Sequence, residues 1–330
     1  MINLKTSYMG LSLKNPIIAA SSGLTNSLND IKALEANGAA AVVVKSLFEE
    51  EIIMETQDNL NKMQSSGFVY PETIEYFDFD NIEDPVANYL KLISDAKKAV
   101  SIPIIASINC VTAEKWPDFA KRIQDAGADA IELNIFALPS DFNRTAAQNE
   151  KLYFDIIEKV TGLVSIPVGV KISPYNASLG SFIQRLGKTP IKSIVLFNRY
   201  YNPDIDIHTL YYTSGSVFST PAEFATTLRW IAIMAERTSC DLAASTGIHD
   251  GNTAIKALLG GASAVQIAST LYRNGFVQIG VMLRQIEEWM NEKQYKTIDE
   301  FRGKMSQAKS FDPAAFERVQ FMKFFKDLKR

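Results

Sequence analysis

Two lysines and three asparagines stand at the ends of short apolar runs: Lys45, Lys171, Asn109, Asn134 and Asn198. A buried amide or ammonium group costs free energy unless it is hydrogen-bonded or paired, although any one of these residues could also be a solvated rim residue. Gathered at one place, such groups suit a ligand with carbonyls, ring nitrogens and one anionic group. None of the runs ends in a carboxylate, which excludes a carboxylate-pair hydrolase and argues against a carboxylate metal site.

The apolar runs alternate with longer amphipathic stretches. Each run is rich in Val, Ile or Ala without clean alternation, as is typical of strands buried on both faces. The intervening stretches have helical spacing, and several end on a glycine, as in DIKALEANG and NTAIKALLGG. The eight runs are NPIIAAS (15–21), AAVVVKS (40–46), PIIASIN (103–109), AIELNIF (130–136), PVGVKIS (167–173), KSIVLFN (192–198), DLAAST (241–246) and AVQIAST (264–270).

Eight strand–helix units in about 300 residues predict an α/β fold of the (β/α)8 or TIM-barrel class. The alternative is a doubly wound open sheet, but no GxGxxG follows the first strand. We expect one barrel domain over residues 1–305 and a helical tail over residues 306–330. A long loop (47–83) after the second strand and an insertion (199–220) after the sixth are expected to be lids or binding loops.

The last two strands carry a pattern that suits a phosphate group. STGIHDG (245–251) follows the seventh strand, and the eighth ends in IAST (267–270). In barrels these two loops commonly bind phosphate through backbone N–H groups. We therefore interpret Gly247 and Ser269 as phosphate contacts, with Gly215 and Ser216 as additions. Gly247 could instead be only a turn glycine, and His249 could contact the phosphate or simply lie on the loop.

Cysteine and histidine are scarce, and the net charge is small. Cys110 and Cys240 are too few for a disulfide framework; Cys110 is more often a small buried hydrophobe than a nucleophile, and Cys240 is expected to be structural. With only His208 and His249 added, no zinc or other metal site is expected. The net charge of −3 gives no case for nucleic acid or an anionic membrane surface. Without a leader or a long apolar run, a cytoplasmic protein is expected.

In combination, these motifs resemble the class 1 dihydroorotate dehydrogenases, which are FMN-dependent. NPIIAASSG, VVVKS, ASIN, IELNIFALPS, VGVKISPY, LFN, STGIHDG and GASAVQIASTLYRNG follow the family's order, and KTIDEFRGKM is similar to its ending. The combination is specific, although no single motif is. The resemblance implies an FMN-binding TIM barrel that oxidises dihydroorotate to orotate, in pyrimidine biosynthesis, by hydride transfer to the flavin.

The resemblance also assigns roles to individual residues. Asn134 would lie between flavin and substrate, Lys171 would favour negative charge on the flavin ring, and Asn198 would bind substrate. Together with Asn109, the positions that match the flavin site are Ala20, Ser21, Gly23, Lys45, Ser46, Asn134, Lys171, Asn198, Gly215, Ser216, Thr246, Gly247, Ala268 and Ser269.

The substrate side departs from the family pattern. Ala137 stands where the family has its catalytic cysteine, and alanine can transfer no proton. Gln64 replaces an asparagine of the loop after the second strand, and Arg199 replaces a small hydroxyl residue beside Asn198. Arg199 could bind a substrate carboxylate bidentately. The candidates for a displaced base are Cys110, Ser140 and Tyr70.

Three functions therefore remain open. The first is oxidation of dihydroorotate or a close relative with a displaced base. The second is an FMN oxidoreductase with a different cyclic or unsaturated substrate. The third is a flavin-binding protein with little turnover. The resemblance further implies a homodimer, and an electron acceptor that is either fumarate or a separate electron-transfer subunit carrying FAD and an iron–sulfur cluster, because no cysteine run here could hold one.

Overall fold

The computed structural model describes residues 2–48, 85–109, 116–135, 138–199 and 203–317. Eight parallel strands close into a barrel, because β4 pairs with both β3 and β6 at the seam. The predicted (β/α)8 barrel is confirmed. In the order in which they neighbour one another, its strands are β3 (Ile17–Ala19), β4 (Ala41–Val43), β6 (Ile104–Asn109), β7 (Ala130–Asn134), β8 (Val168–Ile172), β9 (Ser193–Leu196), β12 (Asp241–Ser245) and β13 (Ala264–Ile267).

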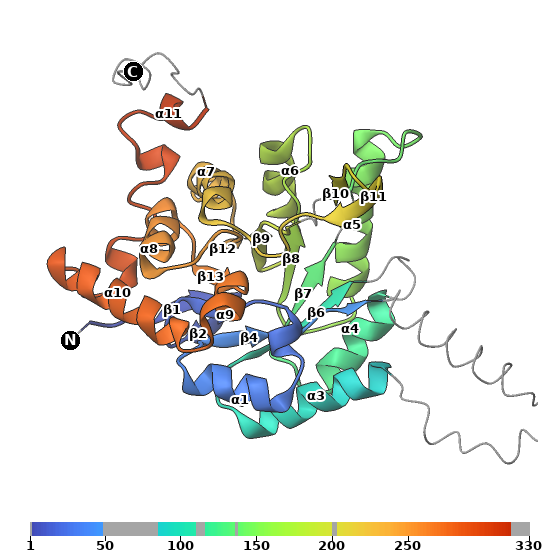
Figure 1. The fold of residues 1–330 in the computed structure, drawn as a ribbon, viewed down its shortest axis with the longest axis horizontal. Helices are drawn as coiled ribbons and strands as arrows, with labels where there is room; N and C mark the ends of the chain where they lie inside the picture. Colours follow the sequence, from blue (N-terminus) through green and yellow to red (C-terminus); the bar gives the residue numbers. More distant parts are fainter. Residues whose placement is uncertain (1, 49–84, 110–115, 136–137, 200–202, 318–330) are drawn as a thin grey trace, which may run out of the picture.

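Helices surround the barrel (Figure 1). Their apolar faces pack on the outward-facing side chains of the strands. Ile31 and Leu34 of α1, Ile93 of α3 and Ile183 of α6 are fully buried there. Such faces follow the helical spacing of the sequence. The helices after the strands are η1 (Gly23–Thr25), α1 (Leu28–Ala36), α3 (Pro85–Ala99), α4 (Trp116–Asp125), α5 (Ala146–Thr161), α6 (Leu179–Leu186), η4 (Pro221–Glu223), α7 (Phe224–Met234), α8 (Gly251–Gly260), α9 (Ser269–Asn274) and α10 (Gln278–Glu292).

A short hairpin covers the amino-terminal end of the barrel. Its strands β1 (Thr6–Tyr8) and β2 (Leu11–Leu13) pair antiparallel around a two-residue turn. Met9 and Gly10 of the turn both have positive φ, as hairpin turns of this length prefer. Tyr8, Met9 and Leu13 are at most 1% exposed and contact the inward-facing residues of the strands. The backbone N–H of Met9 donates to Asp241 at the start of β12, at 2.8 Å. The hairpin therefore seals this end.

The insertion after β9 contains a second hairpin, of β10 (Pro203–Asp206) and β11 (Tyr211–Ser214), whose strands pair antiparallel. The short β5 (Leu47–Phe48) extends the sheet beside β6, and the remainder of the predicted loop 47–83, from residue 49 on, lies outside the described residues.

The chain after α10 returns to the barrel. It forms η5 (Ile298–Glu300), η6 (Gln307–Lys309) and α11 (Ala314–Glu317). Phe301 is fully buried against Trp289 and Tyr295, and the backbone N–H of Met305 donates to Leu259 in α8. Ser306 and Gln307 are also buried. The domain boundary at residue 305 stays a prediction.

Inward-facing residues alternate along each barrel strand, as the pleat requires. Towards the hairpin they are apolar, as with Ala130, Val195 and Ala243. On two of these strands the inward-facing residue becomes polar two positions further along: Glu132 follows Ala130 on β7, and Ser245 follows Ala243 on β12. Val195 on β9 is followed two positions later by the apolar Phe197. No helix within the described ranges is long and apolar enough to cross a membrane.

Candidate functional site

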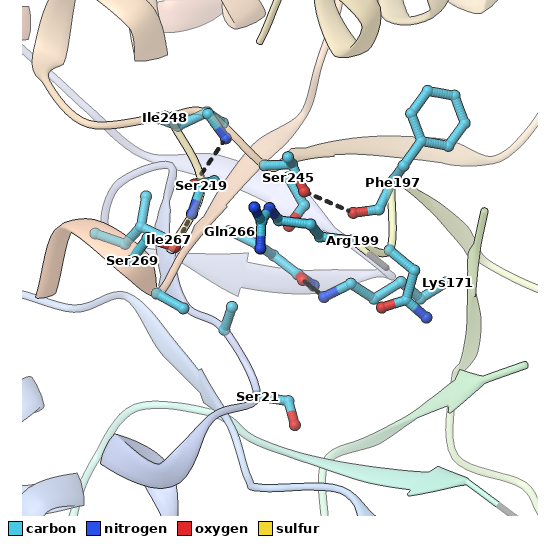
Figure 2. Close-up of a pocket in the computed structure, with 15 residues that line it drawn as sticks. Ser21, Lys171, Phe197, Arg199, Ser219, Ser245, Ile248, Gln266, Ile267 and Ser269 are labelled. Atoms are coloured by element: carbon cyan, nitrogen blue, oxygen red, sulfur yellow. Dashed lines mark hydrogen bonds between the residues drawn. The ribbon is translucent and has the colours of Figure 1, made fainter. Parts of the chain in front are cut away.

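A pocket opens at the carboxyl ends of the strands, where sites of this fold lie. Its lining comes from the ends of β3, β8, β9, β12 and β13 and from the segment after β11 (Figure 2). Nine of the residues predicted from the sequence line it together: Ala20, Ser21, Lys171, Asn198, Arg199, Thr246, Gly247, Ala268 and Ser269.

Lys171 reaches the base of this pocket from the carboxyl-terminal part of β8. It is 7% exposed, and its ammonium group donates to Oε1 of Gln266 at 3.1 Å, as Figure 2 shows. The same Nζ lies 3.8 Å from Oε1 of Glu132. Gln266 in turn donates through Nε2 to Glu132 Oε2, so the three side chains form one buried cluster.

Glu132 and Gln266 were missed at the sequence level. Glu132 is 2% exposed and Gln266 is 1% exposed, and each interrupts an apolar strand. The alternation of side chains along a strand could have indicated Glu132. It stands two residues before Asn134, so both side chains must point to the same side, into the barrel. Gln266 stands two residues before Ala268 in the same way. Neither Glu132 nor Gln266 belongs to the polar strand ends from which the site was predicted.

Serines and amides at neighbouring strand ends form a hydrogen-bonded network. The hydroxyl of Ser46 lies 3.1 Å from that of Ser21 and 2.7 Å from that of Ser107 on β6. Asn134 donates through Nδ2 to Ser46 Oγ at 3.5 Å and accepts a hydrogen bond from Asn198 Nδ2 at Oδ1. These contacts fix the orientation of both amides at the barrel mouth.

The chain turns sharply after β12, at the predicted phosphate segment. Thr246 and Gly247 both have positive φ, 76° and 78°. A Cβ added to Gly247 would lie 2.4 Å from the backbone nitrogen of Phe224, so this position has no room for a side chain. Thr246 is held there by a hydrogen bond from Oγ1 to the carbonyl of Phe197. A glycine is therefore required at position 247, because the backbone of Phe224 approaches it closely.

Ser219 completes this side of the pocket. Its hydroxyl accepts from the N–H of Gly247 at 3.3 Å and lies 3.3 Å from Nε2 of His249. Its own N–H donates to Ser269 Oγ at 3.0 Å. Burial, together with nearby Arg273, lowers the pKa of His249 and favours the neutral imidazole. Ser219 was not predicted; Gly215 and Ser216, which were, do not line the pocket.

Arg199 sits in the pocket wall with its guanidinium already bonded. Nε donates to Glu223 Oε2 at 2.8 Å, Nη1 to the carbonyl of Val217 at 2.9 Å and Nη2 to that of Ser216 at 2.8 Å. Glu223 also accepts from the N–H of Thr220. The side chain is 18% exposed. In this arrangement Arg199 ties the end of β9 to the segment that carries Ser219.

The other predicted residues lie around this pocket or away from it. Gly23 is exposed, Lys45 is half-buried, and Asn109 is buried at the end of β6. Ser140 is exposed in the loop after β7. Cys240 packs against the start of β9 with Sγ 3.3 Å from the carbonyl of Ile191, and burial raises its pKa. Four predicted positions lie outside the described residues: Gln64, Tyr70, Cys110 and Ala137.

The donor set has two chemically different ends. One end gathers backbone N–H groups, hydroxyls and a neutral imidazole around Gly247, Ser219, Ser269 and His249, which suits a phosphate. The other end gathers the Lys171 ammonium and the amides of Asn134 and Asn198, which suits a ring with carbonyls and nitrogens. A flavin mononucleotide fits this division.

Comparison with known proteins gives one consistent family. The family model described as dihydroorotate dehydrogenase matches residues 3–290. Dihydroorotate dehydrogenase B (NAD(+)), catalytic subunit, from Thermoplasma volcanium is 28% identical over 313 residues, covering 92% of this chain and 98% of the relative. The proteins of the same name from Thermoplasma acidophilum and Methanocaldococcus jannaschii are 27% and 25% identical, over 92% and 91% of this chain and 99% and 97% of the relatives.

Proposed function

This chain belongs to the dihydroorotate dehydrogenase family, whose members are flavoproteins and oxidise a CH–CH bond, and we propose that it binds FMN and oxidises dihydroorotate or a closely related cyclic compound. The observation that carries the proposal is the two-ended donor set of the pocket, with Lys171 at one end and Gly247 and Ser269 at the other. Fold alone would not support it, since barrels host many chemistries.

The phosphate of FMN would be held at the end formed by three chain segments. Gly247, Ser269 and Ser219 come from the loops after β12, β13 and β11, and hydrogen bonds from the N–H groups of Gly247 and Ser219 to serine hydroxyls already hold the three segments together. Neutral His249 adds a hydrogen-bonding nitrogen at the same place. The roles predicted for Ala20, Ser21, Thr246 and Ala268 as further contacts remain part of the proposal.

Lys171, Asn134, Asn198 and Ser46 would serve the ring and the substrate. Bound FMN would supply a two-electron acceptor that takes hydride from a substrate carbon. Lys171 holds a positive charge where negative charge develops, so it acts electrostatically and without reorganisation. The paired amides of Asn134 and Asn198 present donors and acceptors to substrate carbonyls. Lys45 is proposed to contact the ring beside Ser46.

The proton that leaves the substrate needs a general base, and Ala137 cannot be it. Ser140 is exposed, and Cys110 and Tyr70 remain candidates outside the described residues. The same alanine supports a second candidate function, oxidation of a different substrate. We do not assign Arg199 to substrate binding in either case, because each of its three guanidinium nitrogens already donates a hydrogen bond, to Glu223 or to a backbone carbonyl.

The names of the relatives indicate a partner subunit. Each is called the catalytic subunit of an NAD(+)-linked enzyme. We therefore propose that reduced flavin in this chain is reoxidised through a separate electron-transfer subunit, and that the chain forms the homodimer expected from its family. Size-exclusion chromatography with light scattering tests the dimer.

The function is tested in two steps. The stripped protein is first titrated with FMN, where binding of one flavin per chain is expected. The reconstituted protein is then mixed anaerobically with excess dihydroorotate while the flavin absorbance is followed. Bleaching supports dihydroorotate as substrate. Bleaching by dithionite but not by dihydroorotate refutes that substrate and leaves the second candidate, and failure to bind FMN refutes both.

A further inference from the structure

A carboxylate shielded from solvent lies directly behind the lysine of the pocket. Glu132 is 2% exposed, and its Oε1 lies 3.8 Å from the ammonium nitrogen of Lys171. Gln266 connects the two by accepting from Lys171 and donating to Glu132 Oε2. Opposite charges this close largely cancel for any third group nearby. Lys171 therefore cannot present its full positive charge to a ligand while Glu132 is ionised.

The carboxylate oxygen that faces Lys171 accepts no hydrogen bond. Oε1 of Glu132 is buried and has no hydrogen-bond partner in the part of the chain that the structure describes, and the hydroxyls of Tyr8 and Ser193, which interact with each other, are buried as well. Across β7, β8 and β9, Glu132, Gly169 and Ser193 occupy neighbouring register positions, and Gly169 leaves room for the Ser193 hydroxyl. Glu132 accepts a hydrogen bond from Gln266 at Oε2, and its counter-charge is the Lys171 ammonium at Oε1. If that ammonium pairs with a new negative charge, a buried ionised carboxylate becomes costly, whereas its protonated form is much less so.

Other titratable groups face Glu132 from the packed elements. Tyr8 on β1 and Tyr89 on α3 both interact electrostatically with it. Burial raises the pKa of each tyrosine hydroxyl, and the Glu132 carboxylate raises both further, so the two phenols stay neutral near neutral pH.

We propose that Glu132 takes up a proton at Oε1 when a flavin bound beside Lys171 is reduced. The inference rests on the proposed function, since it requires that flavin. Two electrons and one proton arrive as hydride from the substrate and add one negative charge next to Lys171. A second proton, from solvent, neutralises Glu132. The buried cluster then keeps the same total charge, and the ammonium of Lys171 faces the new negative charge undiminished.

The test is the pH dependence of the flavin reduction potential. For a two-electron couple each proton taken up shifts the potential by about 30 mV per pH unit. The wild-type protein is expected to fall by about 60 mV per pH unit between about pH 6 and pH 8, and Glu132→Gln by about 30 mV. The potential of Glu132→Gln should lie above the wild type at the alkaline end and approach it at the acidic end.

Glu150→Gln is the matched control, because Glu150 is another buried glutamate paired with a cation, Arg185, on the outer helices α5 and α6. It should keep the wild-type slope. Should Glu132→Gln not hold flavin, electrochemical reduction of the wild type in weak buffer with a pH indicator should consume two protons per anionic reduced flavin.

The outcomes separate the two proposals. A slope of about 60 mV in Glu132→Gln, or about 30 mV in the wild type, overturns the proton uptake by Glu132 while leaving the flavin function intact. Uptake of one proton in the indicator experiment does the same. A protein that takes up no FMN overturns the proposed function and this inference together.

Discussion

The two ends of the barrel interior differ in chemistry although the same strands build both. The lower layer, formed by Ala130, Val195 and Ala243 under the β1–β2 hairpin, is apolar and sealed. The upper layer, formed by Glu132, Lys171 and Gln266, is polar, buried and bonded together across three strands. On β7, a step of two residues leads from Ala130 in the lower layer to Glu132 in the upper layer. Substitutions in the two layers should therefore separate stability from reactivity.

The largest effect is expected from Lys171→Met in the upper layer. Removing the ammonium group should slow flavin reduction by about 10²–10³-fold, as loss of one pre-organised electrostatic donor does. It also leaves Glu132 buried without its cation, at a cost of about 3–5 kcal/mol in the free energy of unfolding. The measurements are stopped-flow flavin absorbance and denaturant unfolding.

The double variant Lys171→Met/Glu132→Gln sharpens that prediction. It should recover most of the lost stability, because no buried charge remains, but not the rate of reduction. Recovery of the rate would show that Lys171 acts by packing and would contradict the electrostatic role.

Leu13→Ala in the β1–β2 hairpin tests the lower layer, where we expect an effect on stability and none on reactivity. Leu13 is 1% exposed and packs against the lower layer, so a cavity there should lower the free energy of unfolding by about 2–5 kcal/mol. The flavin reduction potential should stay unchanged, because no polar group of the upper layer is altered. A shifted reduction potential in a folded, flavin-loaded Leu13→Ala protein would contradict the prediction that the lower layer affects stability alone.

Gly10 and Gly247 have nearly equal φ and lie at opposite ends of the barrel, so the same substitution at each compares the two backbones. Gly247 (φ 78°) has no room for a Cβ, whereas Gly10 (φ 77°) has nothing within 4 Å of one. Gly10→Ala should cost about 1 kcal/mol from conformation alone, and Gly247→Ala more, with loss of FMN binding. Thermal unfolding and FMN titration measure both. Equal losses would mean that contact with Phe224 does not matter.

Arg199→Thr tests whether Arg199 holds the Ser219 segment. Losing three charge-assisted hydrogen bonds should weaken FMN binding by about tenfold, with little change in the Michaelis constant for substrate. Lys121→Thr, which removes an exposed helix ion pair, is the control. A raised Michaelis constant with unchanged FMN affinity would return Arg199 to the substrate site.

The smallest effect concerns pH. Burial alone would raise the pKa of Glu223, but hydrogen bonds from Arg199 and Thr220 outweigh it and lower the pKa overall. A lowered folded-state pKa gives stability that is present above the usual glutamate value and lost as pH falls through the folded value. FMN release should therefore begin at a higher pH in Arg199→Thr than in the wild type. Identical acid release profiles would contradict this.

The sequence predicted the barrel because strands buried on both faces are near-continuous apolar runs, and eight such runs are recognisable in the sequence. It predicted Lys171 and Asn134 because they stand at strand ends, and Gly247 because it lies in the STGIHDG segment after the seventh strand. It could not predict the partners of Arg199, since Glu223 and Ser216 approach only through the folded insertion after β9. Glu132 was readable from strand parity, and the β1–β2 hairpin from its Met9-Gly10 turn, but both signals are short and local.

Single-turnover oxidation of dihydroorotate tests the central claim most directly. FMN-loaded protein is mixed anaerobically with a small excess of dihydroorotate, and bleached flavin and orotate are both quantified. We expect one orotate formed for each flavin reduced. A flavin that stays oxidised with dihydroorotate but is reduced by dithionite would contradict the claim, and would mean that the upper layer serves another substrate.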